Sequence, residues 1–278
     1  MRLLRFAVTV LFVLVCAAAV FFNLRIKPDT AKPTIVCSVK EIQAKCGVKE
    51  GELLKYVAAK DEKDGDLTDK IFVENITSFV SEGVSVVNYC VEDSDGNIAK
   101  KSVRLVYTDY QKPTFVLNDD LVFAEGAVAN LSGAAKVTDK FDGDITGRVY
   151  TIFENDKTSS SPQVLFKVTN SKGYTYEWKF AIARLPAEEI GAAYKIKLSN
   201  NLLTLPVKAK KPNFKSFVTG VFYNGKPFSE GKVVVDDFEF STEKDGTFSI
   251  WFRLYTGSGK SRRLLATERL IVVCGGGE

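Results

Sequence analysis

Apolar and polar residues alternate with a period of two over much of this chain. The alternation covers 87–91, where Val87, Tyr89 and Val91 are the apolar members, and it resumes over 103–107 after the turn sequence 93–97. This period predicts antiparallel strands with one buried face and one exposed face. Gly96 and Asn97 suit the positive φ angles of a tight hairpin turn. The pattern therefore predicts a β-hairpin over 87–107.

The same strand-turn-strand pattern occurs twice more along the chain. Its ranges are 164–168, turn 170–173 and 174–182, then 248–254, turn 257–259 and a strand that contains Leu270 and Val272. Each hairpin follows an extended stretch, at 32–36, at 112–116 and more loosely at 194–198. Short strands in blocks of this size are typical of Ig-like β-sandwiches. We therefore expect an all-β fold of tandem Ig-like sandwiches arranged as a rod. The pattern over residues 52–60 does not decide between a helical turn and a strand.

One acidic string occurs twice. Asp61-Glu-Lys-Asp-Gly-Asp-Leu-Thr68 is repeated as Asp139-Lys-Phe-Asp-Gly-Asp-Ile-Thr146, and five of the eight positions are identical. A repeat at the spacing of one small sandwich indicates a duplicated domain.

The N-terminus differs from the rest of the chain. Arg2 and Arg5 precede an apolar run over residues 6–22, and Arg25 and Lys27 follow it. The length and the basic flank predict one transmembrane helix within 1–27, with the remainder extracytoplasmic at the cell membrane. A cleaved signal segment, followed by secretion, is the alternative.

The amino-acid composition limits the partners that this chain could bind and the reactions that it could catalyse. The chain has 278 residues, a formal net charge of +4 and no histidine. The basic residues are scattered among acidic ones, which argues against a nucleic-acid partner. The absence of histidine excludes Ser/His and Cys/His nucleophile pairs. Glycoside hydrolysis by two carboxylates is the chemistry that remains, but the Asp residues lie in repeated turns rather than in one cleft. We therefore expect no enzymatic activity.

The first block resembles a known family. Residues 59–68, then Gly83, then Val87-Asn-Tyr-Cys-Val-Glu-Asp-Ser-Asp-Gly-Asn97 are similar to the bacterial surface Ig-like repeat first described in a pesticidal crystal protein. The resemblance is clear over 28–110, recognisable over 111–186 and degenerate over 190–274. It implies a β-sandwich, an extracytoplasmic setting, and a role as spacer, stalk or adhesive part without enzymatic activity.

The expected domain limits follow from these blocks. They are an anchor or signal segment at 1–27 and three Ig-like domains at 28–110, 111–187 and 188–278, the last divergent.

The acidic strings are the sharpest chemical feature. Their carboxylates are candidate oxygen ligands for calcium, at Asp61, Asp64, Asp66, Asp139, Asp142 and Asp144. The alternative is turn formation, in which Asp side chains accept hydrogen bonds from nearby backbone amides. We favour turn formation and expect no cofactor.

Other residues carry weaker signals. The parity of the strands places Cys37 and Trp178 in cores and Cys90 on an exposed face, and it leaves open any disulfide among Cys37, Cys46 and Cys90. Trp251 is out of phase with Ile250 and Phe252, so it is a candidate for binding a sugar or a protein. Packing within the chain is the favoured alternative for Trp251.

These features together predict a non-enzymatic, membrane-anchored bacterial surface protein that presents tandem Ig-like domains for adhesion or envelope assembly. Its partner is an unknown protein or an envelope glycan, and the membrane is contacted through 6–22. The alternatives are a calcium-stiffened adhesive rod and a carbohydrate-binding accessory to an envelope enzyme.

Overall fold

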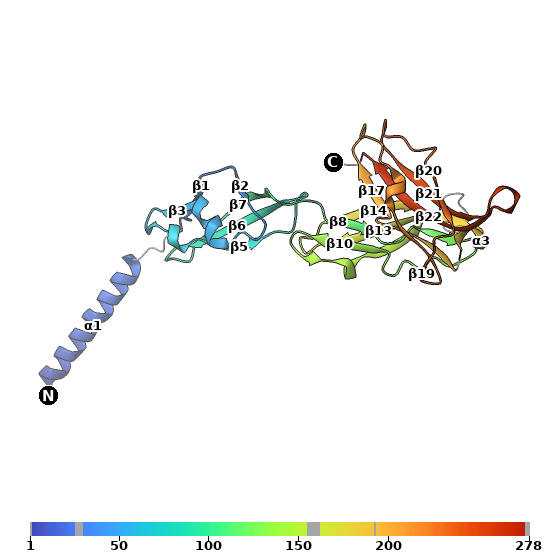
Figure 1. Cartoon of the computed structure of the whole chain (residues 1–278). Coiled ribbons are helices and arrows are strands. Elements are labelled where there is room, and N and C mark those ends of the chain that lie inside the picture. Colours follow the sequence, from blue (N-terminus) through green and yellow to red (C-terminus); the bar gives the residue numbers. More distant parts are fainter. Residues whose placement is uncertain (1, 26–29, 155–161, 192, 276–278) are drawn as a thin grey trace. The chain divides into compact units, whose positions relative to one another are not determined.

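The computed structural model describes the backbone of residues 2–25, 30–154, 162–191 and 193–275. Within the N-terminal helix, side chains are described for residues 7–21. The chain divides into two compact units, Met1–Tyr110 and Gln111–Glu278 (Figure 1). Strands dominate both units, which confirms the prediction of an all-β chain.

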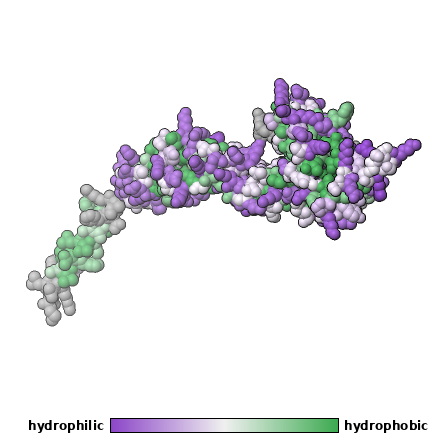
Figure 2. Space-filling view, viewed as in Figure 1, coloured by the Kyte–Doolittle hydropathy of each residue, from purple (hydrophilic) through white to green (hydrophobic). Residues whose placement is uncertain are grey.

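The N-terminal segment forms one helix, α1 (Arg2–Arg25). Its described side chains are apolar apart from that of Thr9 and lie open to the surface, among them Leu11 and Phe12, and Figure 2 shows this apolar surface. No helix within the described residues is both long enough and apolar enough to span a membrane. Phe6, Phe22 and the basic flanks of the predicted span lie outside the described side chains.

The first unit contains two sheets. One has the order β1-β3-β4, from β1 (Thr34–Cys37), β3 (Val57–Asp61) and β4 (Gly65–Asp66). The other has the order β2-β7-β6-β5, from β2 (Glu41–Ala44), β7 (Ile98–Tyr107), β6 (Val84–Glu92) and β5 (Phe72–Ile76). The segment 52–60 contains both candidate structures, since α2 (Glu50–Leu53) and a 3₁₀ turn over Leu54–Tyr56 lead directly into β3.

Alternate residues of the predicted hairpin form the core of the first unit. Val87, Tyr89 and Val91 of β6 are fully buried, as is Leu105 of β7. The Tyr89 hydroxyl donates to the Leu53 carbonyl at 2.9 Å, which satisfies it inside the core. Burial raises the pKa of Tyr89 to about 12.

The parity prediction for Cys90 is wrong. Cys90 is buried, with 6% of its surface exposed. Cys90 pairs with Phe72 of β5 on one side and with Lys100 of β7 on the other. Paired residues on one face of a sheet lie side by side, so the side chains of Phe72 and Lys100 cover Cys90. Cys37, by contrast, is only half-buried. All five cysteines of the chain lie among the described residues, and the structure has no disulfide between any of them.

The second unit repeats the arrangement twice. Its first half contains the sheet β11-β10-β8, the sheet β12-β13-β14 and the parallel pair β15-β9; their bounds are β8 (Thr114–Leu117), β9 (Val122–Ala124), β10 (Ala135–Asp139), β11 (Gly143–Asp144), β12 (Tyr150–Glu154), β13 (Gln163–Thr169), β14 (Thr175–Ala181) and β15 (Ala183–Leu185).

The short helix α3 (Ala187–Ile190) leads into the second half. That half contains the sheets β16-β18-β19 and β17-β22-β21-β20; their bounds are β16 (Tyr194–Leu198), β17 (Leu202–Leu205), β18 (Val218–Tyr223), β19 (Lys226–Pro227), β20 (Lys232–Asp236), β21 (Gly246–Thr256) and β22 (Arg263–Cys274).

One topological feature recurs in all three blocks. A short early strand pairs in parallel with the strand that ends the block, as β2 with β7, β9 with β15 and β17 with β22. The third block therefore keeps the strand arrangement of the first, although its sequence has lost the acidic string.

Strand β22 contributes to two cores within the second unit. Leu270 and Val272 pack with Ile196 and Phe252 in the core of residues 194–274. Ile271, on the opposite face, packs in the core that contains Leu117, Leu121 and Phe166. The sequence predicts separate domains at 111–187 and 188–278, whereas the structure joins these segments in one compact unit. The reason is the unbroken apolar run 270–274, which is typical of a strand buried on both faces.

Candidate functional site

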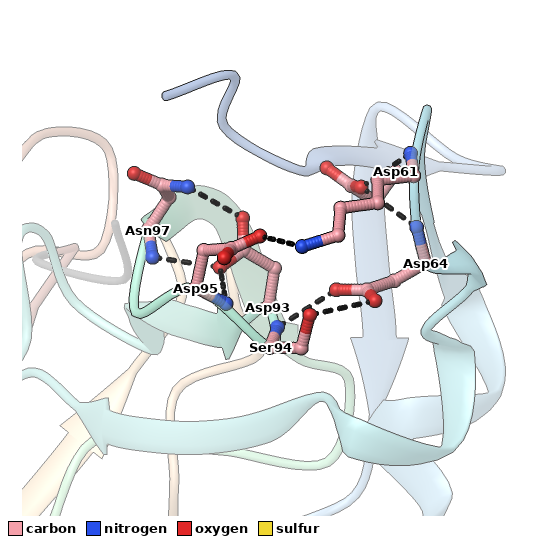
Figure 3. Close-up of polar contacts among 7 residues, drawn as sticks. Asp61, Asp64, Asp93, Ser94, Asp95 and Asn97 are labelled. Carbon is pink, nitrogen blue, oxygen red and sulfur yellow. Dashed lines mark hydrogen bonds and ion pairs between the residues drawn. The ribbon is translucent and has the colours of Figure 1, made fainter. Parts of the chain in front are cut away.

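The acidic string of the first unit forms a turn at the end of β3 (Figure 3). Oδ1 of Asp61 accepts hydrogen bonds from the backbone N–H groups of Lys63 at 2.8 Å and Asp64 at 3.0 Å. Oδ1 of Asp66 accepts from the N–H of Thr68 at 2.9 Å. Gly65 has a φ of +75°, a conformation that favours glycine. Two carboxylates and one glycine thus shape this turn.

Asp64 connects the string to the turn between β6 and β7 (Figure 3). Its Oδ2 accepts from the N–H of Ser94 at 2.7 Å, and its Oδ1 accepts from the Ser94 hydroxyl at 2.8 Å. These hydrogen bonds lower the pKa of Asp64. The acidic string therefore links, through hydrogen bonds, two loops that are distant in sequence.

Asp93 organises the turn between β6 and β7, which Asp64 contacts. Its Oδ1 accepts from the backbone N–H groups of Asp95 at 2.9 Å and Asn97 at 2.8 Å, and its Oδ2 accepts from the Asn97 amide at 2.8 Å. Burial opposes ionisation of Asp93, but the hydrogen bonds from Asn97 and from the backbone outweigh it and lower the pKa.

The second copy repeats the contacts of its carboxylates with backbone N–H groups in the second unit. Oδ1 of Asp139 accepts from the N–H groups of Phe141 at 2.7 Å and Asp142 at 3.1 Å. Oδ2 of Asp142 accepts from the N–H of Ser171 at 2.6 Å and from Arg148 at 2.7 Å.

Asp144 completes the copy. Its Oδ1 accepts from the N–H of Thr146 at 2.9 Å, as Asp66 does from Thr68 in the first unit. The hydrogen bonds from Thr146 lower the pKa of Asp144. The sequence repeat is thus also a repeat of hydrogen-bonding pattern.

The turn that each string contacts differs between the two copies. Asn170 replaces Asp93, and its Oδ1 accepts from Lys172 and Tyr174 in the way that Asp93 accepts from Asp95 and Asn97. The Asn170 amide also donates to Oδ2 of Asp139 at 3.3 Å. Oδ2 of Asp61, the counterpart of that oxygen, is buried without a hydrogen-bond partner among the described residues.

The six predicted ligand carboxylates do not converge on one point. Asp61, Asp64 and Asp66 each bind a different backbone segment, and Asp139, Asp142 and Asp144 do the same. Among the described residues, no group of three or more Asp, Glu, Cys or His side chains is placed to hold a metal ion. Hydrogen bonding within turns accounts for the acidic strings, and calcium binding stays a hypothesis.

Trp251 lies on the face of β21 opposite Ile250 and Phe252, as its phase predicts, and it is half-buried. The guanidinium groups of Arg253 and Arg269 lie 5.9 and 5.7 Å from its ring centroid. Long cationic side chains next to the ring fit packing within the chain. A ligand role for Trp251 stays a prediction.

A polar cluster on β22 was not predicted from the sequence. Arg269 is 2% exposed, and its guanidinium donates to the carbonyls of Asp120 at 2.9 Å, Leu121 at 3.0 Å and Ala181 at 2.9 Å. Burial lowers the pKa of Arg269 to about 10. The signal in the sequence is the charged pair Glu268-Arg269 within the segment 264–274, which is apolar apart from these two residues and Thr267, because charged residues are rare inside buried strands.

Glu268 forms a carboxyl pair with Asp120. Burial, with the charge of Asp120, raises the pKa of Glu268 to about 9, and burial raises that of Asp120 to about 6. Two carboxylates side by side in a buried site repel each other, so the pair keeps one proton near neutral pH.

This pair predicts how stability depends on pH. Between the ordinary pKa of Glu268, near 4.5, and its raised value of about 9, the folded state binds more protons than the unfolded state. Stability of the second unit therefore falls as pH rises through this window, by at most about 1.4 kcal/mol per pH unit for one proton. Urea unfolding of Glu268→Gln is expected to show a flatter pH profile than the parent chain. Glu243→Gln, at an exposed site, is the control, and an unchanged slope in Glu268→Gln contradicts the assignment.

Comparisons with known proteins add little to this geometry. No family model matches the chain, and no curated protein matches it. Among solved structures, the CBM51-2 and INT domains of Clostridium perfringens ZmpB, in complex with GlcNAc, are 16% identical, with a TM-score of 0.23 and coverage of 55% of this chain and 42% of that one. Mouse cadherin-23 EC22-24 is 12% identical, with a TM-score of 0.20 and coverage of 88% and 99%.

The extracellular domain of protocadherin gamma B4 is also 12% identical, with a TM-score of 0.21 and coverage of 87% and 49%. The chain spans less than half the length of the two ZmpB structures that it matches. We draw no functional conclusion from similarity at this level.

Proposed function

We propose that this chain is a non-enzymatic, membrane-anchored protein of the bacterial cell surface, which presents tandem Ig-like sandwiches for adhesion or envelope-assembly contacts. The observation that supports this proposal best is the use of the acidic residues. The paired strings join loops and form turns, and the same arrangement occurs in both units. Residues repeated for the same structural purpose in successive sandwiches suit a presenting scaffold better than a single reaction centre.

The N-terminal segment supports the location. Helix α1 contains the apolar run 6–22, and the run has basic residues on both sides in the sequence. The described side chains of the run are exposed, with 63% of Leu11 and 67% of Phe12 accessible. Exposed apolar side chains over several helical turns need a partner of low polarity, and a bilayer supplies one.

Fractionation of a bacterial host that expresses the full chain tests this proposal. We expect the chain in the membrane fraction, resistant to alkaline extraction and digested by protease added outside intact spheroplasts. Leu11→Lys/Leu14→Lys is expected to release it, since each central charge opposes insertion by about 2.5–3.5 kcal/mol. Val116→Lys/Val128→Lys, which adds the same charges at exposed sites in the second unit, is the matched control. Recovery of the parent chain in the cytosol contradicts the proposal.

A further inference from the structure

The second unit contains a cavity that the proposed function does not use. Its volume is about 790 Å³, within the range of small-molecule binding sites. The loop between β8 and β9, strand β16, the turn between β18 and β19, and strand β22 form its wall. All these segments belong to the unit of residues 111–278.

The carboxyl pair lies in the wall of this cavity. Asp120 and Glu268 both line it, and both keep part of their surface accessible there. Neither forms an ion pair with any described residue. The nearby cation Arg269 directs its guanidinium to the carbonyls of Asp120, Leu121 and Ala181 instead. Because no cation neutralises them, the two carboxyl groups can lie side by side only if the pair holds a proton.

The polar groups beside the carboxyl pair make few hydrogen bonds. Thr267 belongs to the lining, and its hydroxyl is buried without a hydrogen-bond partner among the described residues. Thr267 itself is 4% exposed. The Asn201 amide reaches Glu268 at 3.5 Å, the outer limit of a hydrogen bond.

The remaining charged groups of the lining are of both signs. Asp119 belongs to the same loop as Asp120, whereas Lys195 and Lys197 of β16 are exposed and lie on the lining. A bare cation meets attraction at the carboxyl pair and repulsion from the two lysines. A ligand with an ammonium group and a carboxylate meets the opposite sign for each of its charges.

We propose that this cavity binds a small zwitterion of the amino-acid or short-peptide class, with its ammonium group at Asp120 and Glu268 and its carboxylate toward Lys195 and Lys197. This site is separate from the surface role proposed above and does not depend on it.

Binding is accompanied by release of a proton. The free pair holds one proton near neutral pH. When an ammonium group enters, the pair gains a positive neighbour and loses that proton, because a nearby opposite charge favours the charged form. One proton then leaves to the solvent for each ligand bound.

Isothermal titration of the full chain in detergent tests this proposal. The probes are alanyl-alanine, its N-acetyl derivative and its C-terminal amide, titrated near neutral pH in two buffers of different ionisation enthalpy. We expect the free dipeptide to bind with release of about one proton. The N-acetyl derivative is expected to lose at least about tenfold in affinity and all proton release, and the amide to bind more weakly while it keeps the release.

Two variants refine the test. Glu268→Gln is expected to abolish proton release and to weaken dipeptide binding, whereas Glu243→Gln leaves both unchanged. The ligand series on the parent chain makes the test independent of how Glu268→Gln folds. Failure of the free dipeptide to bind overturns the proposal. Equal affinity for the N-acetyl derivative, or binding without proton release, also overturns it.

Discussion

Replacing Gly191 by alanine is expected to destabilise the second unit by about 2–4 kcal/mol. Gly191 ends α3 with a φ of +76°, a left-handed conformation that disfavours a side chain. A Cβ at this position lies only 2.0 Å from the Leu265 carbonyl oxygen and 3.0 Å from the Ala266 Cα. Strand β22 therefore has to move for alanine to fit. Urea unfolding followed by tryptophan fluorescence measures the effect, since Trp178 and Trp251 both belong to this unit.

Gly133→Ala is the matched control for this prediction. Gly133 also has a φ of +76°, but no atom lies within 4 Å of the added Cβ. Its replacement carries only the backbone penalty, about 1–2 kcal/mol. If the two variants lose the same stability, the close packing of α3 against β22 is not a determinant of this fold.

Replacing Arg269 by methionine is expected to destabilise the same unit by about 3–5 kcal/mol. The guanidinium donates to three backbone carbonyls from two segments, around Asp120 and at Ala181. Methionine fills much of the volume but donates no hydrogen bond, so these carbonyls lose a charged partner in a buried site. The tryptophan-monitored urea experiment also measures this variant.

Arg253→Met is the control for Arg269→Met. Arg253 also lies beside the Trp251 ring, but its partner is the side chain of Asp236 at 2.8 Å, near solvent. An accessible ion pair contributes about 0–1 kcal/mol. Equal losses in the two variants contradict the view that Arg269 joins the two halves of the second unit through backbone carbonyls.

Much of the fold could be predicted from local pattern. The alternation around Val87, Val164 and Ile250 identified the central hairpins because each has one buried face, and these side chains are fully buried. The joining of 111–187 with 188–278 was not predicted. Ile271 and Val273 pack against residues that are far away in sequence. An unbroken apolar run predicts that both faces of a strand are buried, but it does not predict which sheet covers each face.

The candidate site was predictable only in part. The spacing of Asp61, Asp64 and Asp66 indicated turn chemistry, and the hydrogen bonds show which backbone amides each carboxylate binds. The contact from Asp64 to Ser94 joins residues 30 positions apart, so no local rule reaches it. Asp120 and Glu268 are farther apart still, and only the packing of β22 beside the β8–β9 loop brings them together.

Calorimetry of the full chain with and without calcium tests the central claim most directly. That claim is that the acidic strings form turns through hydrogen bonds to their own chain. We predict the same unfolding temperatures in a chelator and in millimolar calcium, and lower ones in Asp66→Ala and Asp144→Ala under both conditions. A calcium-induced rise in unfolding temperature that disappears in these two variants contradicts the account and establishes the strings as metal sites.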